Sequence, residues 1–188
     1  MTIRGVATAA YREALPALVA SLVGGLFAGS VLGGMRAELR AVPGLLVLVP
    51  ALLATRGNVY GAFGARIATG LHQGLVEPVF AVDERLGNAI AAALTNGLIA
   101  SIYAAALAYG VLSTLSRPVA SIDVLLAIAL IAGLLSGLAL TVAVLVVVFV
   151  GYRRGRNPDT LVGPIVTTTG DLFGMAFLLL AVRLVGGA

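Results

Sequence analysis

The stretch IDVLLAIALIAGLLSGLALTVAVLVVVFVGY, residues 122–152, carries one formally charged side chain, that of Asp123 near its start. A hydrocarbon core about 30 Å thick needs roughly 20 helical residues, and this stretch is longer. Arg153, Arg154 and Arg156 follow it directly. The stretch therefore predicts a transmembrane helix with a basic end at the membrane surface.

The composition of the whole chain is that of an integral membrane protein. Of its 188 residues, 60% are hydrophobic and 11% are charged, whereas a soluble domain has about a quarter charged. The net charge of +4 comes from scattered arginines, so no nucleic-acid partner is expected. The absence of cysteine and the single histidine, His72, exclude thiolate and histidine-rich metal sites. No nucleophile or metalloprotease motif occurs, so we expect no enzyme.

Four more apolar runs accompany the first one. We expect an all-α protein of the cell membrane that crosses the bilayer several times. A single domain over 1–188, without a cytoplasmic sensor domain, would have five spans: 14–35, 43–70, 86–112, 122–152 and 158–185. Asn157 as N-cap and Pro158 at the first helical position would start the last span. The arginine distribution favours an N-terminus inside and a C-terminus outside.

The second expected span is unusual. Its apolar part ends at Ala54, which is too short to cross, so it must continue through GNVYGAFGARIATG, residues 57–70. This segment is rich in glycine and contains Arg66, and we therefore expect a helix that is broken or bent near Gly57. Irregular backbone at membrane depth lies against protein or water. Asn58 would then either offer its amide oxygen to an ion or cap the second half of the helix.

The last span contains an acid in GPIVTTTGDLFG, residues 163–174. Asp171 follows Asp159 by twelve residues, or about 18 Å of helix, which places it near the midplane. A carboxylate at that depth is by default a functional-site hypothesis. Pro164, Thr167 and Thr168 precede it by seven, four and three residues, so all four share one helical face. The alternatives are a structural ion pair of Asp171 with Arg56 or Arg66, and a protonated Asp171 that is hydrogen-bonded to a neighbouring helix.

Hydroxyl, carbonyl and carboxylate oxygens on one face suit a hard cation. Mg²⁺ keeps several waters when it binds, so few direct ligands are needed. Asp171, Thr167, Thr168 and Asn58 are the expected metal ligands. Transporter folds often pair two related halves, and this chain has only one such half, so we expect a homodimer. Its two-fold axis would double the number of these ligands. Residues at the pathway or its mouth would be Pro164, Asn157, Gly57, Glu77, Asp83 and Glu84. For the three acids a solvated loop is the commoner explanation.

Two segments resemble the MgtE-type magnesium transporters and their eukaryotic solute-carrier relatives. PGLLVLVPALLATRGNVYGAFGARIATG, 43–70, is similar to the second helix of that family, and NPDTLVGPIVTTTGDLFG, 157–174, to its last helix. The resemblance implies a homodimer with the ion path between second and fifth helices. It also implies that the key pore carboxylate falls on Asp171, and polar pore-lining positions on Asn58, Thr167 and Thr168.

The chain departs from bacterial MgtE proteins in two ways. We expect no magnesium-sensing domain, and Val-Tyr-Gly follows Asn58, which is closer to the solute-carrier branch. The expected function is transport of a divalent cation, Mg²⁺ first, with Mn²⁺ or Co²⁺ as other cargo. An exchanger coupled to Na⁺ or H⁺ and a membrane scaffold without transport are the alternatives.

Overall fold

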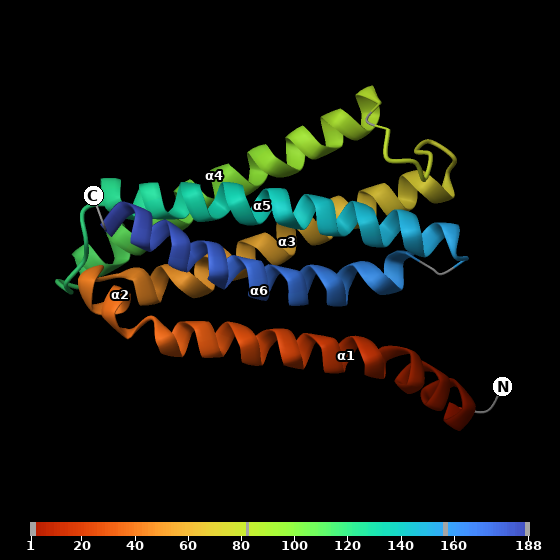
Figure 1. Cartoon of the computed structure of the whole chain (residues 1–188), viewed down its shortest axis with the longest axis horizontal. Helices are drawn as coiled ribbons and strands as arrows, with labels where there is room; N and C mark the ends of the chain where they lie inside the picture. Colours follow the sequence, from red (N-terminus) through yellow and green to blue (C-terminus); the bar gives the residue numbers. More distant parts are fainter. Residues whose placement is uncertain (1–2, 82, 156–157, 187–188) are drawn as a thin grey trace.

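The computed structural model describes residues 3–81, 83–155 and 158–186. Within these ranges every regular element is an α-helix, which confirms the all-α prediction. Five helices are long and one is short (Figure 1), with these bounds: α1 Ile3–Gly34, α2 Arg36–Ala41, α3 Leu45–His72, α4 Glu84–Thr114, α5 Ile122–Arg153 and α6 Pro158–Gly186.

The long helices coincide with the expected spans, and α1 and α4 extend beyond them. By length and composition, four described segments can cross a membrane: Leu45–His72, Glu84–Thr114, Ile122–Arg153 and Leu161–Gly186. The apolar segment of α1, Leu18–Gly34, is shorter. The charged connection after α1 was not expected to be helical, but it forms α2, in which Glu38 lies in the first turn and Arg40 in the last.

The expected break in the second span is wrong. α3 is one uninterrupted helix from Leu45 to His72, with Pro50 inside it. A glycine in a helix costs only about 1 kcal/mol relative to alanine, so Gly57 can remain helical. On either side of Gly57, α3 buries apolar side chains such as Leu52 and Tyr60, and their packing offsets this cost.

Three of the other long helices pack against α6. It contacts α5, α1 and α3 along its length, whereas α4 packs on α3 and α5 from the other side. Figure 1 shows α1 alongside α6, and α4 running obliquely, so that it diverges from α5 toward its connection with α3. α1 begins and α6 ends at opposite ends of the bundle.

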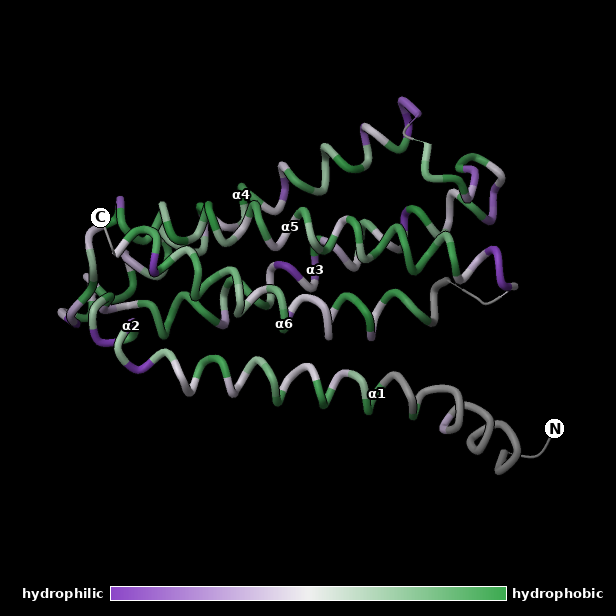
Figure 2. Tube along the Cα trace, in the orientation of Figure 1, coloured by the Kyte–Doolittle hydropathy of each residue, from purple (hydrophilic) through white to green (hydrophobic). Residues whose placement is uncertain are grey.

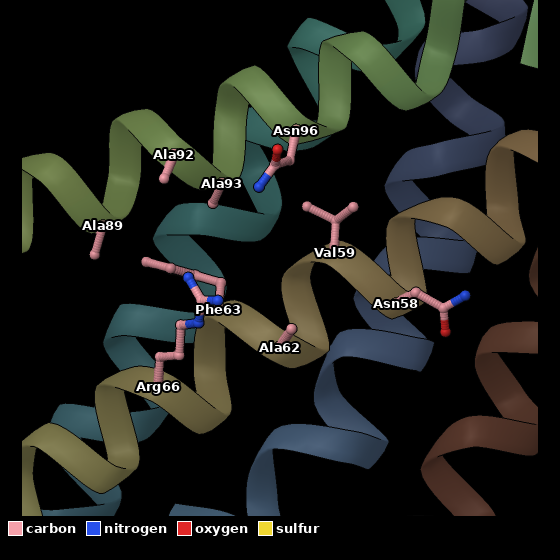
Figure 3. A pocket seen from close by; sticks show the side chains of 9 residues that line it. All are labelled: Asn58, Val59, Ala62, Phe63, Arg66, Ala89, Ala92, Ala93 and Asn96. Atoms are coloured by element: carbon pink, nitrogen blue, oxygen red, sulfur yellow. The ribbon is translucent and has the colours of Figure 1, made fainter. Parts of the chain in front are cut away.

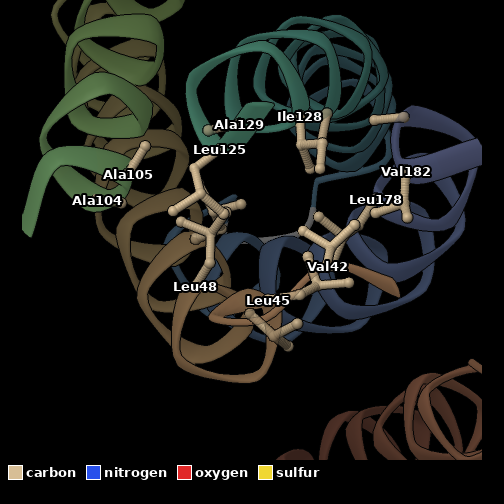
Figure 4. Close-up of a cluster of buried hydrophobic side chains, with 14 of the residues drawn as sticks. Val42, Leu45, Leu48, Ala104, Ala105, Leu125, Ile128, Ala129, Leu178 and Val182 are labelled. Atoms are coloured by element: carbon tan, nitrogen blue, oxygen red, sulfur yellow. The ribbon is translucent and has the colours of Figure 1, made fainter. Parts of the chain in front are cut away.

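Two apolar clusters lie one after the other along the bundle. The first contains Leu45, Leu52, Ile128 and Leu178 among others, and Ala28 of α1 also belongs to it. Figure 4 shows side chains of α3, α4, α5 and α6 converging there. The second contains residues of α3, α4, α5 and α6 nearer the other end of the bundle: Tyr60, Phe63, Ile67, Leu71, Leu86, Ala93, Leu140, Val144, Val148, Phe149, Val162 and Val166.

A polar layer separates the two clusters. Arg56 follows the last α3 residue of the first cluster, and Ser101 and Ser136 are buried at the corresponding places in α4 and α5. On α6 the interval between Val166 and Met175 contains Asp171. Figure 2 shows a short hydrophilic stretch in the middle of α3, within an otherwise hydrophobic bundle centre.

Candidate cation site

The predicted oxygen ligands of α6 lie on one stripe of the helix. Gly163 and Thr167 are exposed, Pro164 and Asp171 are half-buried, and a Cβ at Gly163 would meet nothing within 4 Å. We call the stripe of Pro164, Thr167, Thr168 and Asp171 the Asp171 face. Residues Val162 and Val166, on the other side of α6, are buried in the second cluster. The Asp171 face is therefore directed away from the core of this chain.

Asp171 has no partner in the part of the chain that the structure describes. Its carboxylate makes no hydrogen bond or ion pair with a described residue, and the expected alternative of an ion pair with Arg56 or Arg66 is not formed. The residue lies roughly 20 Å from the start of α6, close to the middle of the helix. Both carboxylate oxygens are therefore available to a ligand from outside this fold.

The two threonines keep acceptor capacity on the same stripe. Thr167 Oγ1 donates to the Gly163 carbonyl at 3.0 Å, and Thr168 Oγ1 donates to the Pro164 carbonyl at 2.8 Å. Such bonds to the preceding turn satisfy the hydroxyl hydrogen but leave a lone pair on each oxygen. Thr167 is exposed and can face a cation or its water shell, whereas Thr168 is partly covered.

α1 covers Thr168. Ser21 Oγ lies 3.5 Å from Thr168 Oγ1. A Cβ on Gly24 would lie 2.7 Å from the Thr168 methyl group and 3.2 Å from its Cα, so only glycine permits this approach. Ser21 adds a hydroxyl oxygen that the sequence analysis did not single out. A Gly-Gly pair in the first span, at Gly24 and Gly25, is the signal that could have indicated the close contact.

Asn58 lies on α3, apart from the α6 ligands. Its side chain is exposed and makes no hydrogen bond with a described residue. In Figure 3 the amide points away from the alanines of α4. A Cβ on Gly57 or Gly61 would meet nothing within 4 Å, so this part of α3 is open. The fold of one chain thus groups Thr167, Thr168 and Asp171 but does not join Asn58 to them.

Arg56 was not predicted to be a buried residue. Its side chain is 4% exposed, and Nε and both Nη atoms lack hydrogen-bond partners among the described residues. The guanidinium packs against Gly174, where an added Cβ would lie 2.7 Å from Nη1. Gly174 is three residues after Asp171, so an uncompensated cation and an uncompensated acid lie at similar depth. The helical spacing of Arg56 with Leu52 and Tyr60 could have indicated its burial.

The predicted mouth residues lie together at one end of the bundle. Glu77 and Asp83 line a cavity of about 260 Å³ in the connection between α3 and α4. Asp83 also caps α4, since its Oδ1 accepts a hydrogen bond of 2.7 Å from the Leu86 N–H. Glu84 is exposed in the first turn of α4. Asn157, the other predicted mouth residue, lies outside the described residues.

The donor set suits a hydrated hard cation rather than a caged one. Among the described residues, no group of three or more His, Cys, Asp or Glu side chains could hold a metal ion. One carboxylate with neighbouring hydroxyl oxygens is a set that a Mg²⁺ ion retaining its waters can use. An apolar helical bundle with helices long enough to cross a bilayer has the architecture of an integral membrane protein.

Comparison with known families agrees with this class. The family model of MgtE, described as a divalent cation transporter, matches residues 49–181, more than half of the chain. The protein therefore belongs to the MgtE family, and its resemblance to that family is confirmed. Its family carries out divalent cation transport in membranes. No protein with a curated description matches the chain.

Proposed function

We propose that this protein transports Mg²⁺ across the cell membrane and that Asp171 is the carboxylate that meets the ion. The observation that carries the proposal is the state of Asp171: it is unpartnered among the described residues, half-buried and close to the middle of α6. A charged acid at that depth costs about 3 kcal/mol without compensation. In a family of divalent cation transporters, the cargo itself is the natural compensation.

The pathway is proposed to lie at the two-fold axis of a homodimer. The Asp171 face is directed away from the core, and Thr167 on it is exposed, so a second copy could present the same face opposite. Two carboxylates and two Thr167 hydroxyls would then face one hydrated ion, with the partly covered Thr168 hydroxyls beside them. Asn58, which does not reach Asp171 in one chain, would line the same path from α3.

The orientation is proposed to be N-terminus inside, with all five long helices crossing. The end of the bundle next to the α3–α4 connection has Arg4 and Arg12 in the first part of α1 together with Arg85, Arg153 and Arg154, and the opposite end has Arg36, Arg40, Arg117 and Arg183. The larger number of arginines favours the first end as cytoplasmic. The cavity lined by Glu77 and Asp83 would then be a cytoplasmic mouth, where acidic side chains concentrate cations.

Flux into liposomes that contain the purified protein tests the proposal. Wild-type protein should carry Mg²⁺, and Asp171→Asn and Asp171→Ala should lower the flux by at least about tenfold, because a charge-assisted contact is lost. Asp123→Asn, which changes an exposed acid at the start of α5, is the matched control and should keep wild-type flux.

Two results would contradict the proposal. Wild-type flux in both Asp171 variants would remove the residue from the pathway. Wild-type liposomes no more permeable to Mg²⁺, Mn²⁺ or Co²⁺ than empty ones would instead favour a scaffold without transport. Flux that appears only with a Na⁺ or proton gradient would assign the protein to the coupled exchangers.

A further inference from the structure

A groove between α3 and α4 carries two arginines that the cation site does not use. It has a basic part of about 390 Å³, lined by residues that include Arg66, Arg85, Thr69 and Gln73. A second part of about 300 Å³ continues along the same two helices and shares Arg66 and Ala89 with the first. We call the two parts together the α3–α4 groove.

The two arginines have no acidic partner. Arg66 and Arg85 are both exposed, and neither forms an ion pair with a described residue. Arg85 Nη1 donates a long hydrogen bond of 3.4 Å to the Leu75 carbonyl. Two like charges from different helices that converge on one groove repel each other unless an anion lies between them. The groove therefore has the charge of an anion site.

The depth of the groove matches a phospholipid. Arg85 is the second residue of α4 and lies at the helix end, whereas Arg66 precedes the end of α3 by six residues, or about 9 Å. Both guanidinium groups thus lie within reach of the headgroup region. An arginine near the headgroup region is stabilised by the negative charge of an anionic lipid.

The second part of the groove is suited to an acyl chain. It is lined mainly by Val59, Ala62, Phe63, Ala92 and Ala93, with Asn96 at its deep end. Asn58 also borders it, with its amide directed away from α4. Figure 3 shows Arg66 rising from α3 toward the alanines of α4 at the shallow end, and the Asn96 amide pointing toward α3. From Arg66 to Val59 the groove runs about 10 Å, most of the hydrocarbon depth of one leaflet.

We infer that the α3–α4 groove is a binding site for one anionic phospholipid. Its phosphate lies between Arg66 and Arg85, and one acyl chain lies along the alanines. A free anion would use only the two arginines and would leave the apolar part of the groove empty. The bilayer, in contrast, supplies phosphodiesters at the depth of the two arginines. This inference does not depend on transport.

Lipid binding to the purified full chain in a nonionic detergent tests the inference. The probes are dioleoyl phosphatidylglycerol, dioleoyl phosphatidylcholine and inorganic phosphate, and the readouts are bound lipid by native mass spectrometry and the shift in unfolding temperature. Phosphatidylglycerol should bind and stabilise the protein, whereas the other two should not. The double variant Arg66→Gln, Arg85→Gln should bind it at least about tenfold more weakly.

Two further variants separate charge from shape. Arg154→Gln removes an exposed arginine at the same end of the bundle and should bind phosphatidylglycerol as the wild type does. Ala89→Leu keeps both arginines but fills the part of the groove that the two cavities share, so it should also lose the lipid. If the double variant does not fold, Ala89→Leu alone still tests whether the lipid binds in the groove.

Four outcomes would overturn the inference. They are equal binding of the two lipids, undiminished phosphatidylglycerol binding in the double variant or in Ala89→Leu, the full stabilisation by phosphate alone, and a dimer that dissociates in the double variant. The third would assign the site to a free anion, and the fourth would assign the groove to a second copy.

Discussion

Two unpartnered charges in the middle of the bundle have opposite surroundings. Arg56 on α3 is 4% exposed and packs on Gly174, between the two apolar clusters. Asp171 on α6 is half-buried on a stripe where Thr167 is exposed. Neither makes an ion pair in the described structure. At nearly the same depth, one charge is enclosed by its own chain and the other is left open to what lies outside it.

The difference shows which of the two charges can have a ligand. A cation on a pathway needs an acid that water can reach, and Asp171 meets this requirement. The Arg56 guanidinium is enclosed by its neighbours, so no ligand can replace the hydrogen bonds that it lost on burial. In the proposed site its charge would therefore act only through its field, whereas Asp171 would act by contact.

The largest expected effect is a difference in water access, and the cysteine-free chain allows it to be measured directly. Thr167 lies one turn before Asp171, and Leu52, which is 1% exposed, lies one turn before Arg56. With a charged thiol reagent, Thr167→Cys should react at least about tenfold faster than Leu52→Cys, because the reactive thiolate forms only where water reaches it.

A third cysteine distinguishes water from lipid. Leu180 is 42% exposed on α6 but lies among apolar side chains, so Leu180→Cys should react as slowly as Leu52→Cys. Equally slow labelling at all three positions would mean that the Asp171 face is dry, and the contrast with Arg56 would disappear.

The next effect concerns the contact of α1 with the Asp171 face. Gly24→Ala would place a Cβ 3.2 Å from the Thr168 Cα and 3.3 Å from its carbonyl oxygen, and these backbone atoms cannot move aside easily. We expect a loss of about 1–3 kcal/mol in the free energy of unfolding, measured in detergent. Gly25→Ala, with nothing within 4 Å of the new Cβ, should be neutral or slightly stabilising. Equal stability of the two variants would remove α1 from the site.

A smaller effect is expected when the enclosed charge is removed. Arg56→Met keeps the length of the side chain and removes three nitrogens that lack partners within the described residues. It should raise the unfolding free energy by about 1 kcal/mol, since a buried polar group without a hydrogen bond is destabilising. Arg66→Met, at an exposed position, is the control and should change it less. A clear loss of stability in Arg56→Met would mean that Arg56 has a partner in the assembled protein.

The smallest expected effect concerns two charged side chains that form an ion pair with each other. Arg183 Nε donates to Glu38 Oε1 at 3.0 Å. The pKa of Glu38 is lowered from its usual 4.5, first by its own backbone N–H and then by Arg183. A group with a lowered folded pKa stabilises the fold above its unfolded pKa and loses this contribution as the pH falls through the folded value.

The unfolding temperature as a function of pH measures this contribution. Wild-type protein should lose slightly more stability than Glu38→Gln when the pH falls below about 4.5, and the two should be parallel above it. Curves that are parallel throughout would show that the pair contributes nothing, in contrast to the uncompensated charges of the bundle centre.

The sequence predicted the long helices well because each depends on local properties. The run 122–152 becomes α5, Ile122–Arg153, nearly residue for residue, since hydrophobicity and length alone define such a helix. α2 was missed because six residues with two arginines and a glutamate have no apolar periodicity. α1 begins earlier than expected, since a helix does not have to stop where the membrane stops.

The site was less predictable where it depends on contacts between distant segments. The shared face of Thr167, Thr168 and Asp171 follows from helical spacing, and in the structure all three residues lie in the one helix α6. The contact of Gly24 with Thr168 and that of Arg56 with Gly174 join residues more than a hundred positions apart, and no local pattern shows them. The break expected near Gly57 was wrong because the glycines and Arg66 of this segment were taken as a sign of irregular backbone, whereas α3 is continuous.

Crystals soaked in Mn²⁺ give the most direct test of the central claim that Asp171 meets the transported ion. The account predicts an anomalous peak on the axis between two copies, within one water shell of both Asp171 carboxylates, and no such peak in Asp171→Asn. A peak that persists in Asp171→Asn, or strong peaks elsewhere in the spans with none near Asp171, would contradict it.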